Sequence, residues 1–456
     1  MIERACVAAL RAREAQRYRE RHARCAELGA CSARHFLYGV PLHWMSDWGT
    51  PSPLFVRDAA GARLSCADGH DHADFCLADT AAMFGHSPPA LVRALAARLG
   101  HGLGAMLPGP DLPQAGRLLA ERFGLPLWQM ALSASDANRF CLRWARAVTG
   151  RSRIVVFDGC YHGTVDDVFV DRIEAPPGAA PSLRTRASLL GQVVDWTRFT
   201  RVVEFNDAAA LEQALQDRSV ACVIAEPVMT NVGMVLPAEG FLRRMQELCR
   251  ATGTLLLLDE THTLSSAAGG YGREHGLEPD FLVLGKAIAG GVPCAVYGFG
   301  EELGARMRRA KDQAPPGHSG IGTTLSGNLL ATAALRATLE EVATPEAYKI
   351  MLQRAHQLEQ GLRAAIEAHG LAWCVTRVGA RCELQFCPRP PRNGREARAA
   401  MDHELETAIH LYLLNRGVLI TPFHNMMLCC PQTGAQDVDA LARIFGQCLD
   451  ELVTPR

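Results

Sequence analysis

The sequence predicts an α/β protein with a largely parallel, buried central sheet and a smaller α+β region toward the C-terminus. Short, continuous apolar runs bounded by loops are typical of strands that are covered on both faces. Such runs occur at 154–157, 221–225, 254–258, 281–284 and 295–299. Strands that alternate with helices favour a parallel sheet. Helices are expected at 2–28, 88–99, 113–122, 137–149, 325–370, 396–415 and 436–452, with short strands around 383–386 and 418–421.

Composition excludes several classes of protein. Lys and Arg total 47 and Asp and Glu total 48, so the chain lacks the basic excess of a nucleic-acid binder. It contains no apolar run of the ~18 residues that a membrane span needs, and its Arg- and Glu-rich N-terminus does not resemble a signal peptide. Of the 16 cysteines, Cys222, Cys249 and Cys294 lie in apolar or helical runs of a chain that we expect to be cytosolic, which argues against disulfides. No CxxC pair occurs, which argues against a zinc site. We expect a cytoplasmic protein that binds no metal, nucleic acid or membrane.

Lysine is rare in this chain, which contains only Lys286, Lys311 and Lys349. Lys286 follows the apolar run 281–284 and precedes a glycine-rich turn. Burial at a strand end lowers a lysine's pKa and favours the free amine that a Schiff-base nucleophile needs. A lysine whose stem covers apolar surface while its amine reaches solvent is the alternative, and it is the better interpretation of this segment alone.

Asp259 ends the preceding apolar run, 254–258. In open α/β sheets, ligands bind beyond the carboxyl ends of the strands. An aspartate there can pair with the protonated pyridine nitrogen of a cofactor and make the ring an electron sink. A helix cap or turn carboxylate explains Asp259 alone equally well, but its position one strand before Lys286 favours the cofactor interpretation of both residues.

Two further segments fit a planar cofactor with a phosphate. The small residues 133–135 open the helix expected at 137–149, where backbone N–H groups bind anions. Ordinary helix capping explains them as well. Tyr161 follows the strand expected at 154–157, and its ring either stacks on a cofactor or packs within the loop.

In this order, these segments resemble the class III (subgroup II) aminotransferases of fold type I, the aspartate aminotransferase-like fold, which use pyridoxal 5′-phosphate (PLP). The likeness is strongest to the branch of glutamate-1-semialdehyde aminomutases and β-amino-acid transaminases. It covers roughly residues 50 to 450. The motifs that carry it are S-A-S-D-A (133–137), G-C-Y-H-G (159–163), E-P-V-M-T-N-V-G (226–233), D-E (259–260), L-G-K (284–286) and the stretch 322–328.

The resemblance implies a role for each matching residue. Lys286 would form the Schiff base with PLP and shuttle protons, Asp259 would pair with the pyridine nitrogen, and Glu226 and Asn231 would support the region of Asp259. The cofactor site as a whole would comprise Ser133, Ala134, Ser135, Tyr161, His162, Glu226, Asn231, Asp259, Thr261, His262, Lys286 and Thr324.

The phosphate and the ring face would be held by residues from two subunits. Ser133, Ala134 and Ser135 would bind the phosphate, although Ala134 stands where the family has glycine. Thr324 would reach the same phosphate from the partner subunit, so the resemblance implies a homodimer. Tyr161 would stack on the ring.

The turn after Asp259 departs from the family, which usually has valine and then glutamine or methionine. Here Thr261 and His262 occupy these positions. Thr261 would lie against the ring, and His262 would hydrogen-bond the phenolic oxygen of the cofactor. The His262 imidazole either titrates near neutral pH or serves as a neutral donor in place of glutamine.

The resemblance also implies three regions and an activity. Residues 1–60 would form an N-terminal helix and substrate-side segment that packs with the small domain, 61–315 the large PLP-binding domain, and 316–456 the small α+β domain. The expected enzyme is a transaminase that moves an amino group from an amine, ω-amino acid or β-amino acid to a keto acid or aldehyde by ping-pong kinetics. An intramolecular aminomutase and a racemase or epimerase, which would use the same Lys286 and Asp259, are the alternatives.

The substrate contacts are less defined. The segment 34–48 is aromatic-rich and includes Trp44, which indicates either an apolar substrate side or domain packing. Arg34 is a candidate carboxylate clamp, and Arg381 is its rival, because arginine pairs with carboxylates through two hydrogen bonds. Met106–Pro108 replace small polar residues of the aminomutases, which disfavours glutamate-1-semialdehyde as substrate.

Overall fold

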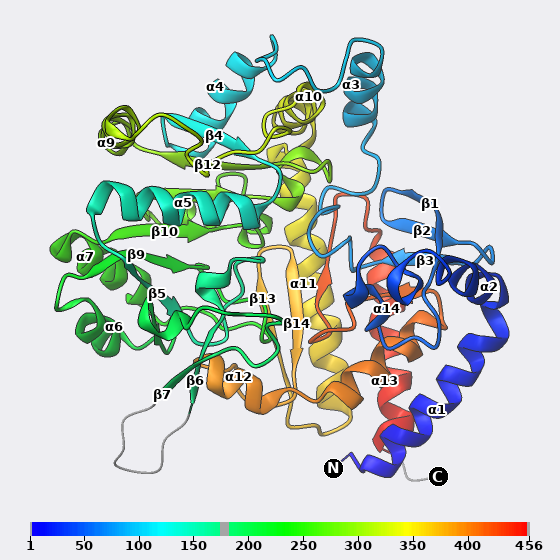
Figure 1. The fold of residues 1–456 in the computed structure, drawn as a ribbon. Coiled ribbons are helices and arrows are strands. Elements are labelled where there is room, and N and C mark those ends of the chain that lie inside the picture. Colours follow the sequence, from blue (N-terminus) through cyan, green and yellow to red (C-terminus); the bar gives the residue numbers. More distant parts are fainter. Residues whose placement is uncertain (1, 174–181, 454–456) are drawn as a thin grey trace. The chain divides into compact units, whose positions relative to one another are not determined.

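The computed structural model describes residues 2–173 and 182–453 (Figure 1). The chain divides into two compact units, each with its own sheets. We call Pro89–Thr344 with Pro391–Ala399 the sheet unit, and Met1–Pro88, Pro345–Pro390 and Ala400–Arg456 the terminal unit. Within the described residues, none of the helices has the length and apolarity required to cross a membrane.

The sheet unit is built on a seven-stranded sheet with the order β4-β12-β11-β10-β9-β5-β8. The strands are β4 (Leu127–Ala131), β5 (Arg153–Phe157), β8 (Thr200–Val203), β9 (Val220–Ala225), β10 (Leu255–Asp259), β11 (Phe281–Leu284) and β12 (Ala295–Phe299). β8, β5, β9, β10 and β11 are parallel, whereas β12 is antiparallel to both neighbours. The prediction of a largely parallel sheet is confirmed.

Helices cover both faces of this sheet. Phe140 of α5 packs with Val156 of β5 in the main apolar cluster, whereas Phe157, on the opposite face, packs edge-on against Phe241 of α7. The helices of the unit are α3 (Pro89–Leu99), α4 (Leu112–Phe123), α5 (Ala134–Thr149), α6 (Ala208–Leu215), α7 (Phe241–Thr252), α8 (Gly270–Glu274), α9 (Glu301–Gln313), α10 (Leu329–Ala337) and α12 (Gly394–Ala400). A hairpin of β6 (Val170–Ile173) and β7 (Ser182–Thr185) lies outside the main sheet. Coverage on both faces explains why the strand sequences are continuously apolar.

The terminal unit joins both ends of the chain. Its four-stranded sheet contains β1 (Val56–Ala60), β2 (Arg63–Cys66), β3 (Asp71–Asp74) and β15 (Val418–Leu419), and its three-stranded sheet contains β13 (Cys374–Val378), β14 (Arg381–Gln385) and β16 (Met427–Leu428). Its helices are α1 (Arg4–Arg21), α2 (Ala23–Ser32), α11 (Pro345–Ala368), α13 (His403–Leu414) and α14 (Ala435–Val453). Leu362, Val375 and Phe445 lie in one buried apolar cluster, so helices and strands share a core.

Each unit is assembled from segments that are distant in the sequence. Residues 61–88 join the terminal unit because β3 pairs in parallel with β15, with Ala73 N–H donating to Gly417 O at 2.8 Å. Residues 316–344 join the sheet unit, in which α10 packs on α3 and α4. Both assignments depend on contacts between residues far apart in the sequence.

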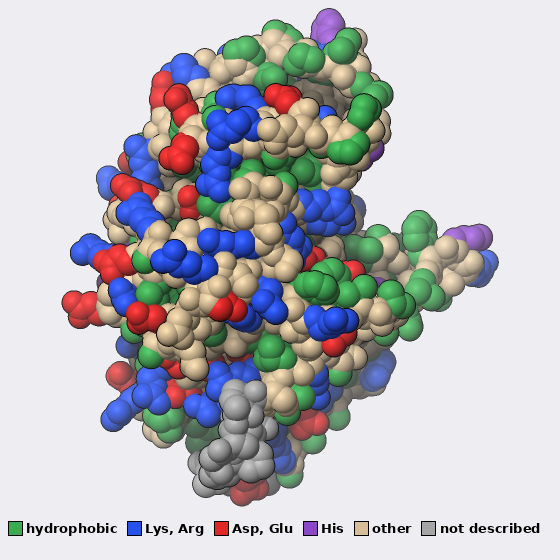
Figure 2. Space-filling model, turned by 60° about the vertical axis from the view of Figure 1, so that its left-hand side comes forward, with side chains coloured by type: hydrophobic (Ala, Val, Ile, Leu, Met, Phe, Trp, Pro, Cys, Tyr) green, Lys and Arg blue, Asp and Glu red, His purple; other side chains and the backbone are tan. Residues whose placement is uncertain are grey.

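The surface of the molecule carries mixed charge. On the face that Figure 2 draws, Arg and Lys side chains lie among acidic and hydrophobic ones. This distribution agrees with the formal net charge of −1.

Candidate active site

Lys286 stands directly beyond the carboxyl end of β11, after Gly285. Its backbone has φ +48°, and a non-glycine residue in this left-handed region carries a conformational cost of about 1 kcal/mol or more. The side chain is half-buried, and its Nζ lies 2.5 Å from Nε2 of His262. The strained turn therefore directs the amine toward the turn that follows β10.

Asp259 ends β10, the neighbouring strand, and is 4% exposed. Its Oδ2 accepts hydrogen bonds from Asn138 Nδ2 at 2.8 Å and from His162 Nδ1 at 3.0 Å. Its Oδ1 accepts from the Thr261 backbone N–H at 3.1 Å and from Thr261 Oγ1 at 2.6 Å. Four donors on one buried carboxylate stabilise its ionised form.

The pKa of Asp259 reflects this arrangement. Burial alone raises the pKa of a carboxyl, but hydrogen bonds from His162, Thr261 and Asn138 and the charge of His162 outweigh it and lower the pKa of Asp259 to about 2. Burial opposes the charged form of His162, yet Cys160 and Asp259 raise the pKa of its imidazole. The site thus holds a permanent negative charge at the end of β10, as the pairing with a pyridine nitrogen requires.

A second group of buried polar side chains surrounds His262. Its Nδ1 lies 2.5 Å from Thr230 Oγ1 and 3.6 Å from Glu226 Oε2. Glu226 also accepts a hydrogen bond from Thr230 Oγ1 at 2.6 Å and one from Asn231 Nδ2 at 3.2 Å. Glu226 and Asn231, which were expected to support the region of Asp259, lie on the His262 side of the site.

The start of α5 meets the backbone beside Lys286. A Cβ placed on Gly285 would lie 2.8 Å from the Cβ of Ala134, so only glycine allows the turn to approach the helix. Ser133 caps the helix, its Oγ accepting from Asp136 N–H at 3.2 Å, and Ser135 Oγ accepts from Thr164 N–H at 3.0 Å. The unit thereby places a helix N-terminus, which favours anions, next to Lys286.

These features fit PLP. Lys286 offers an amine for the aldehyde, Asp259 a carboxylate for the ring nitrogen, and residues 133–135 a helix N-terminus for the phosphate. Nε2 of His162 is buried and has no hydrogen-bond partner among the described residues, so the site contains a polar atom that the protein alone leaves unsatisfied. A cofactor with polar ring substituents is the chemistry that such a site accommodates.

A cavity of about 550 Å³ is lined by Tyr161 and Asn231, two residues that the sequence predicted for the cofactor site. Tyr161 is 41% exposed, and its ring lies 6.3 Å from that of Phe169. Asp171, which accepts a hydrogen bond from Arg186 Nε at 2.9 Å, also lines the cavity. The basic residues along its wall are Arg172, Arg184, Arg186 and Arg398. This excess of positive charge favours an anionic ligand group.

Other expected site residues are not among these contacts. Thr324 is exposed in the loop between α9 and α10. Arg34, Trp44 and Arg381 all belong to the terminal unit; Arg34 and Trp44 are exposed. Arg381 is fully buried and donates from Nη2 to Thr80 Oγ1 at 2.6 Å. Two residues that the sequence did not single out, Asn138 and Thr230, contact the site directly.

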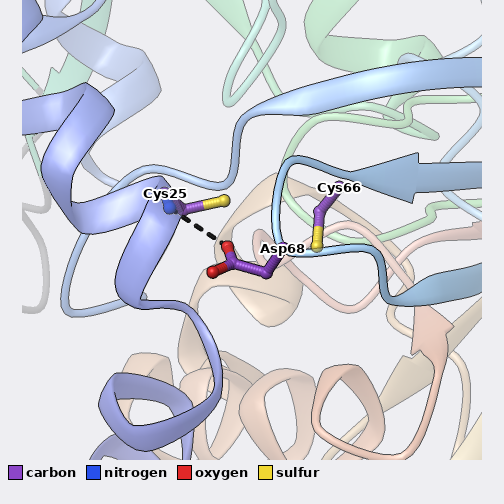
Figure 3. Close-up of side chains that lie close together, drawn as sticks. All are labelled: Cys25, Cys66 and Asp68. Carbon is purple, nitrogen blue, oxygen red and sulfur yellow. Dashed lines mark hydrogen bonds between the residues drawn. The ribbon is translucent and has the colours of Figure 1, made fainter.

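The described residues also contain a group of three potential metal ligands in the terminal unit, Cys25, Cys66 and Asp68 (Figure 3). Their ligand atoms lie within 4.8 Å of one another. The carboxylate of Asp68 accepts the backbone N–H groups of Arg24 at 2.7 Å and Cys25 at 3.0 Å. These two N–H groups belong to the first turn of α2. Asp68, which lies outside the helix, therefore caps its N-terminus.

Known proteins resemble this chain over most of its length. The family model "Aminotransferase class-III" matches residues 44–449. A glutamate-1-semialdehyde 2,1-aminomutase of Sorangium cellulosum is 35% identical over 406 residues, which are 88% of this chain and 89% of that protein. A relative of the same name from Aquifex aeolicus is 31% identical over 81% of this chain and 85% of its own length.

Solved structures extend the likeness to the fold. A glutamate-1-semialdehyde-aminomutase from Pseudomonas aeruginosa PAO1 has a TM-score of 0.95 and 48% identity over 99% of both chains, and a K286A form of that protein was solved in complex with PMP. A β-phenylalanine aminotransferase from Variovorax paradoxus has a TM-score of 0.83 and 26% identity over 97% of both chains. The expected PLP fold type I is thus confirmed, and the chain belongs to the class-III aminotransferase family, with PLP as its cofactor.

Proposed function

We propose that this enzyme is an aminomutase of the glutamate-1-semialdehyde type, which moves an amino group between adjacent carbons of one substrate. The observation that carries the proposal is the 48% identity over 99% of both chains to the Pseudomonas aeruginosa protein of that description. The proposal reverses the preference drawn from the sequence, which placed intermolecular transamination first.

The residues of the site divide the chemistry among them. PLP, when bound, supplies an electron sink that makes loss of a proton from carbon feasible. Asp259 keeps a proton on the ring nitrogen, because its own carboxyl stays ionised. Lys286 Nζ removes a proton from one carbon bonded to the transferred nitrogen and returns it to the other carbon bonded to that nitrogen. The N-terminus of α5 would hold the phosphate end of the cofactor.

The arginine-lined cavity supports an anionic substrate. Glutamate-1-semialdehyde keeps one carboxylate remote from the carbons that exchange the amino group. Arg172 and Arg184 line the cavity beside Tyr161 and provide a counter-charge for such a carboxylate. We therefore assign the substrate class as small amino compounds with a distal carboxylate.

The test supplies glutamate-1-semialdehyde to the purified enzyme in its pyridoxamine phosphate form, without a keto acid or amino donor. Formation of 5-amino-4-oxopentanoate, in amounts equal to the substrate consumed over many turnovers, is the expected result. Lys286→Ala should reduce the rate at least about 10²- to 10⁴-fold, the contribution typical of one general base. Lys311→Ala, which replaces a lysine of α9, is the matched control. Conversion that stops after one equivalent and resumes only with a keto acid would contradict the proposal.

That last outcome would establish the second candidate, intermolecular transamination. One observation favours it: Met106 and Leu107, 79% and 70% exposed, are large and apolar where the aminomutases carry small polar residues. The same assay therefore decides between the two activities.

We also propose that the enzyme is a homodimer in which Thr324 reaches the phosphate bound by the other subunit. Its exposure in the loop after α9 supports this role. Light scattering should give twice the chain mass, and Thr324→Ala should weaken PLP binding about 10- to 10²-fold, because it removes one hydrogen bond to a charged acceptor. A monomer that binds PLP fully would contradict both parts.

A further inference from the structure

Three consecutive hydrogen bonds connect the reactive lysine to a buried carboxylate. Lys286 Nζ lies 2.5 Å from His262 Nε2, His262 Nδ1 lies 2.5 Å from Thr230 Oγ1, and Thr230 Oγ1 lies 2.6 Å from Glu226 Oε2. His262, Thr230 and Glu226 are 6%, 1% and 5% exposed. The connection is therefore shielded from bulk water, and its hydrogen bonds are stronger than they would be on the surface.

The single hydroxyl hydrogen of Thr230 gives this arrangement a direction. A carboxylate at Glu226 only accepts, so Thr230 donates its hydrogen to Glu226 and must accept one from His262 Nδ1. This fixes the imidazole as the tautomer that carries hydrogen on Nδ1. Its Nε2 then presents a lone pair to Lys286 Nζ, in the manner by which a third group orients a catalytic histidine.

We propose that His262 is the base that takes the proton from the Lys286 ammonium group, and that Thr230 and Glu226 are the residues that position it. The step is a proton transfer in which the ammonium becomes an amine and the imidazole an imidazolium, so atoms and charge balance. Glu226, 3.6 Å from Nδ1, offsets the charge that His262 acquires. The free amine is the form that condenses with the PLP aldehyde. The inference rests on the cofactor chemistry of the proposed function, but not on which substrate is used.

The other charged groups near His262 are engaged elsewhere. Asp259 and His162 are paired with each other at 3.0 Å. Glu260, on the same turn, accepts the backbone N–H groups of Tyr271 at 2.5 Å and Gly272 at 2.8 Å, so it faces α8. Burial raises the pKa of Glu260 to about 7, and its titration must be separated from that of His262.

The experiment measures how fast the full-length apoenzyme binds PLP at pH values from 6 to 10, following the visible absorbance that appears when a lysine amine condenses with the aldehyde. We expect His262→Gln and Thr230→Val to slow PLP binding at least about tenfold near pH 7, because the base that takes the ammonium proton is lost or misplaced, and to approach the wild-type rate at pH 10, where hydroxide can take that proton. Thr230→Ser keeps the hydroxyl and should restore the wild-type profile. Any part of the pH profile that comes from the titration of Glu260 is the same in all these variants.

Thr200→Val is the matched control. Thr200 and Thr230 are both 1% exposed and both donate from Oγ1 at 2.6 Å, Thr200 to the backbone carbonyl of Asp167. The pH profile of Thr200→Val should equal that of wild type. Superimposable profiles for wild type, His262→Gln and Thr230→Val would overturn the proposal, and slower binding in His262→Gln alone would overturn the role of Thr230.

A folding defect and a failure of the proposed function are both distinguishable from this result. If Thr230→Val melts well below wild type by circular dichroism, Glu226→Gln replaces it, because it keeps the shape of the side chain and removes the charge. A wild-type enzyme that makes no 5-amino-4-oxopentanoate, together with variants that bind PLP as slowly as expected, would refute the aminomutase activity and leave the role of His262 intact. A wild-type enzyme without the absorbance band would overturn both.

Discussion

The carboxyl end of β10 holds two consecutive buried carboxyl groups in opposite ways. Asp259 faces side chains that include the titratable His162, and its pKa falls to about 2. Glu260 faces the backbone N–H groups of α8 and the hydroxyl of Thr263, and burial raises its pKa to about 7. Each receives several hydrogen bonds, so the difference lies in the counter-charge. Neutral donors alone do not keep a fully buried carboxyl ionised here, whereas a histidine does.

The largest expected effect comes from removing the fixed charge. Asp259→Asn keeps the shape of the side chain but eliminates the partner of the ring nitrogen, so turnover should fall about 10²- to 10³-fold, as for loss of one preorganised electrostatic group. Steady-state kinetics with saturating PLP measure it. Asp217→Asn is the control, because Asp217 is also a carboxylate of lowered pKa, paired with Arg201 on the surface. Equal rates for the Asp259 variant and wild type would refute the assigned role.

Glu260 should instead control how stability depends on pH. Its pKa is raised from 4.5 to about 7 in the folded state, so between these values the folded chain binds a proton that the unfolded chain has lost. The free energy of unfolding should therefore decrease as pH rises from 4.5 to 7, by up to about 3 kcal/mol in total. Urea unfolding of the apoenzyme at pH 5, 6, 7 and 8 measures this slope.

The matched variant for this measurement is Glu260→Gln, which does not titrate. The difference between wild type and variant should contain the whole decrease assigned to Glu260, because all other groups are shared. Asp259 has the opposite sign: its contribution is present above pH 4 and is lost as pH falls through about 2. Parallel slopes for wild type and Glu260→Gln would mean that Glu260 is ionised throughout.

The sequence predicted the strands of this region well, because each is a continuous apolar run with clear ends. The run 281–284 coincides with β11 and the run 295–299 with β12. It did not predict β4 (Leu127–Ala131), which is only partly buried and contains Gln129 within its apolar pattern. Burial on both faces is thus the property that allows a strand to be predicted from the sequence.

Within the site, the sequence identified the residues at strand ends but not those that reach them from elsewhere. Lys286 and Asp259 follow apolar runs in the expected order. Asn138 donates to Asp259 across 121 sequence positions from within α5, and a polar residue in a helix ordinarily indicates a solvated face. Thr230 lies inside a loop motif, where nothing distinguishes its hydroxyl from a turn residue. Such contacts require the folded arrangement.

The smallest expected effects separate the two carboxyl groups most sharply. Thr261 Oγ1 donates to Asp259 at 2.6 Å and Thr263 Oγ1 donates to Glu260 at 3.2 Å. Thr261→Val loses a hydrogen bond to a charged acceptor and should cost about 1.5 to 3 kcal/mol of unfolding free energy at both pH 6 and pH 8. Thr263→Val should cost only about 0.5 to 1.5 kcal/mol at pH 6, where Glu260 is mostly protonated, and more at pH 8, where it is charged. Both values come from urea unfolding of the apoenzyme, and a Thr263→Val cost that is equal at the two pH values would show that the charge on Glu260 does not change between them.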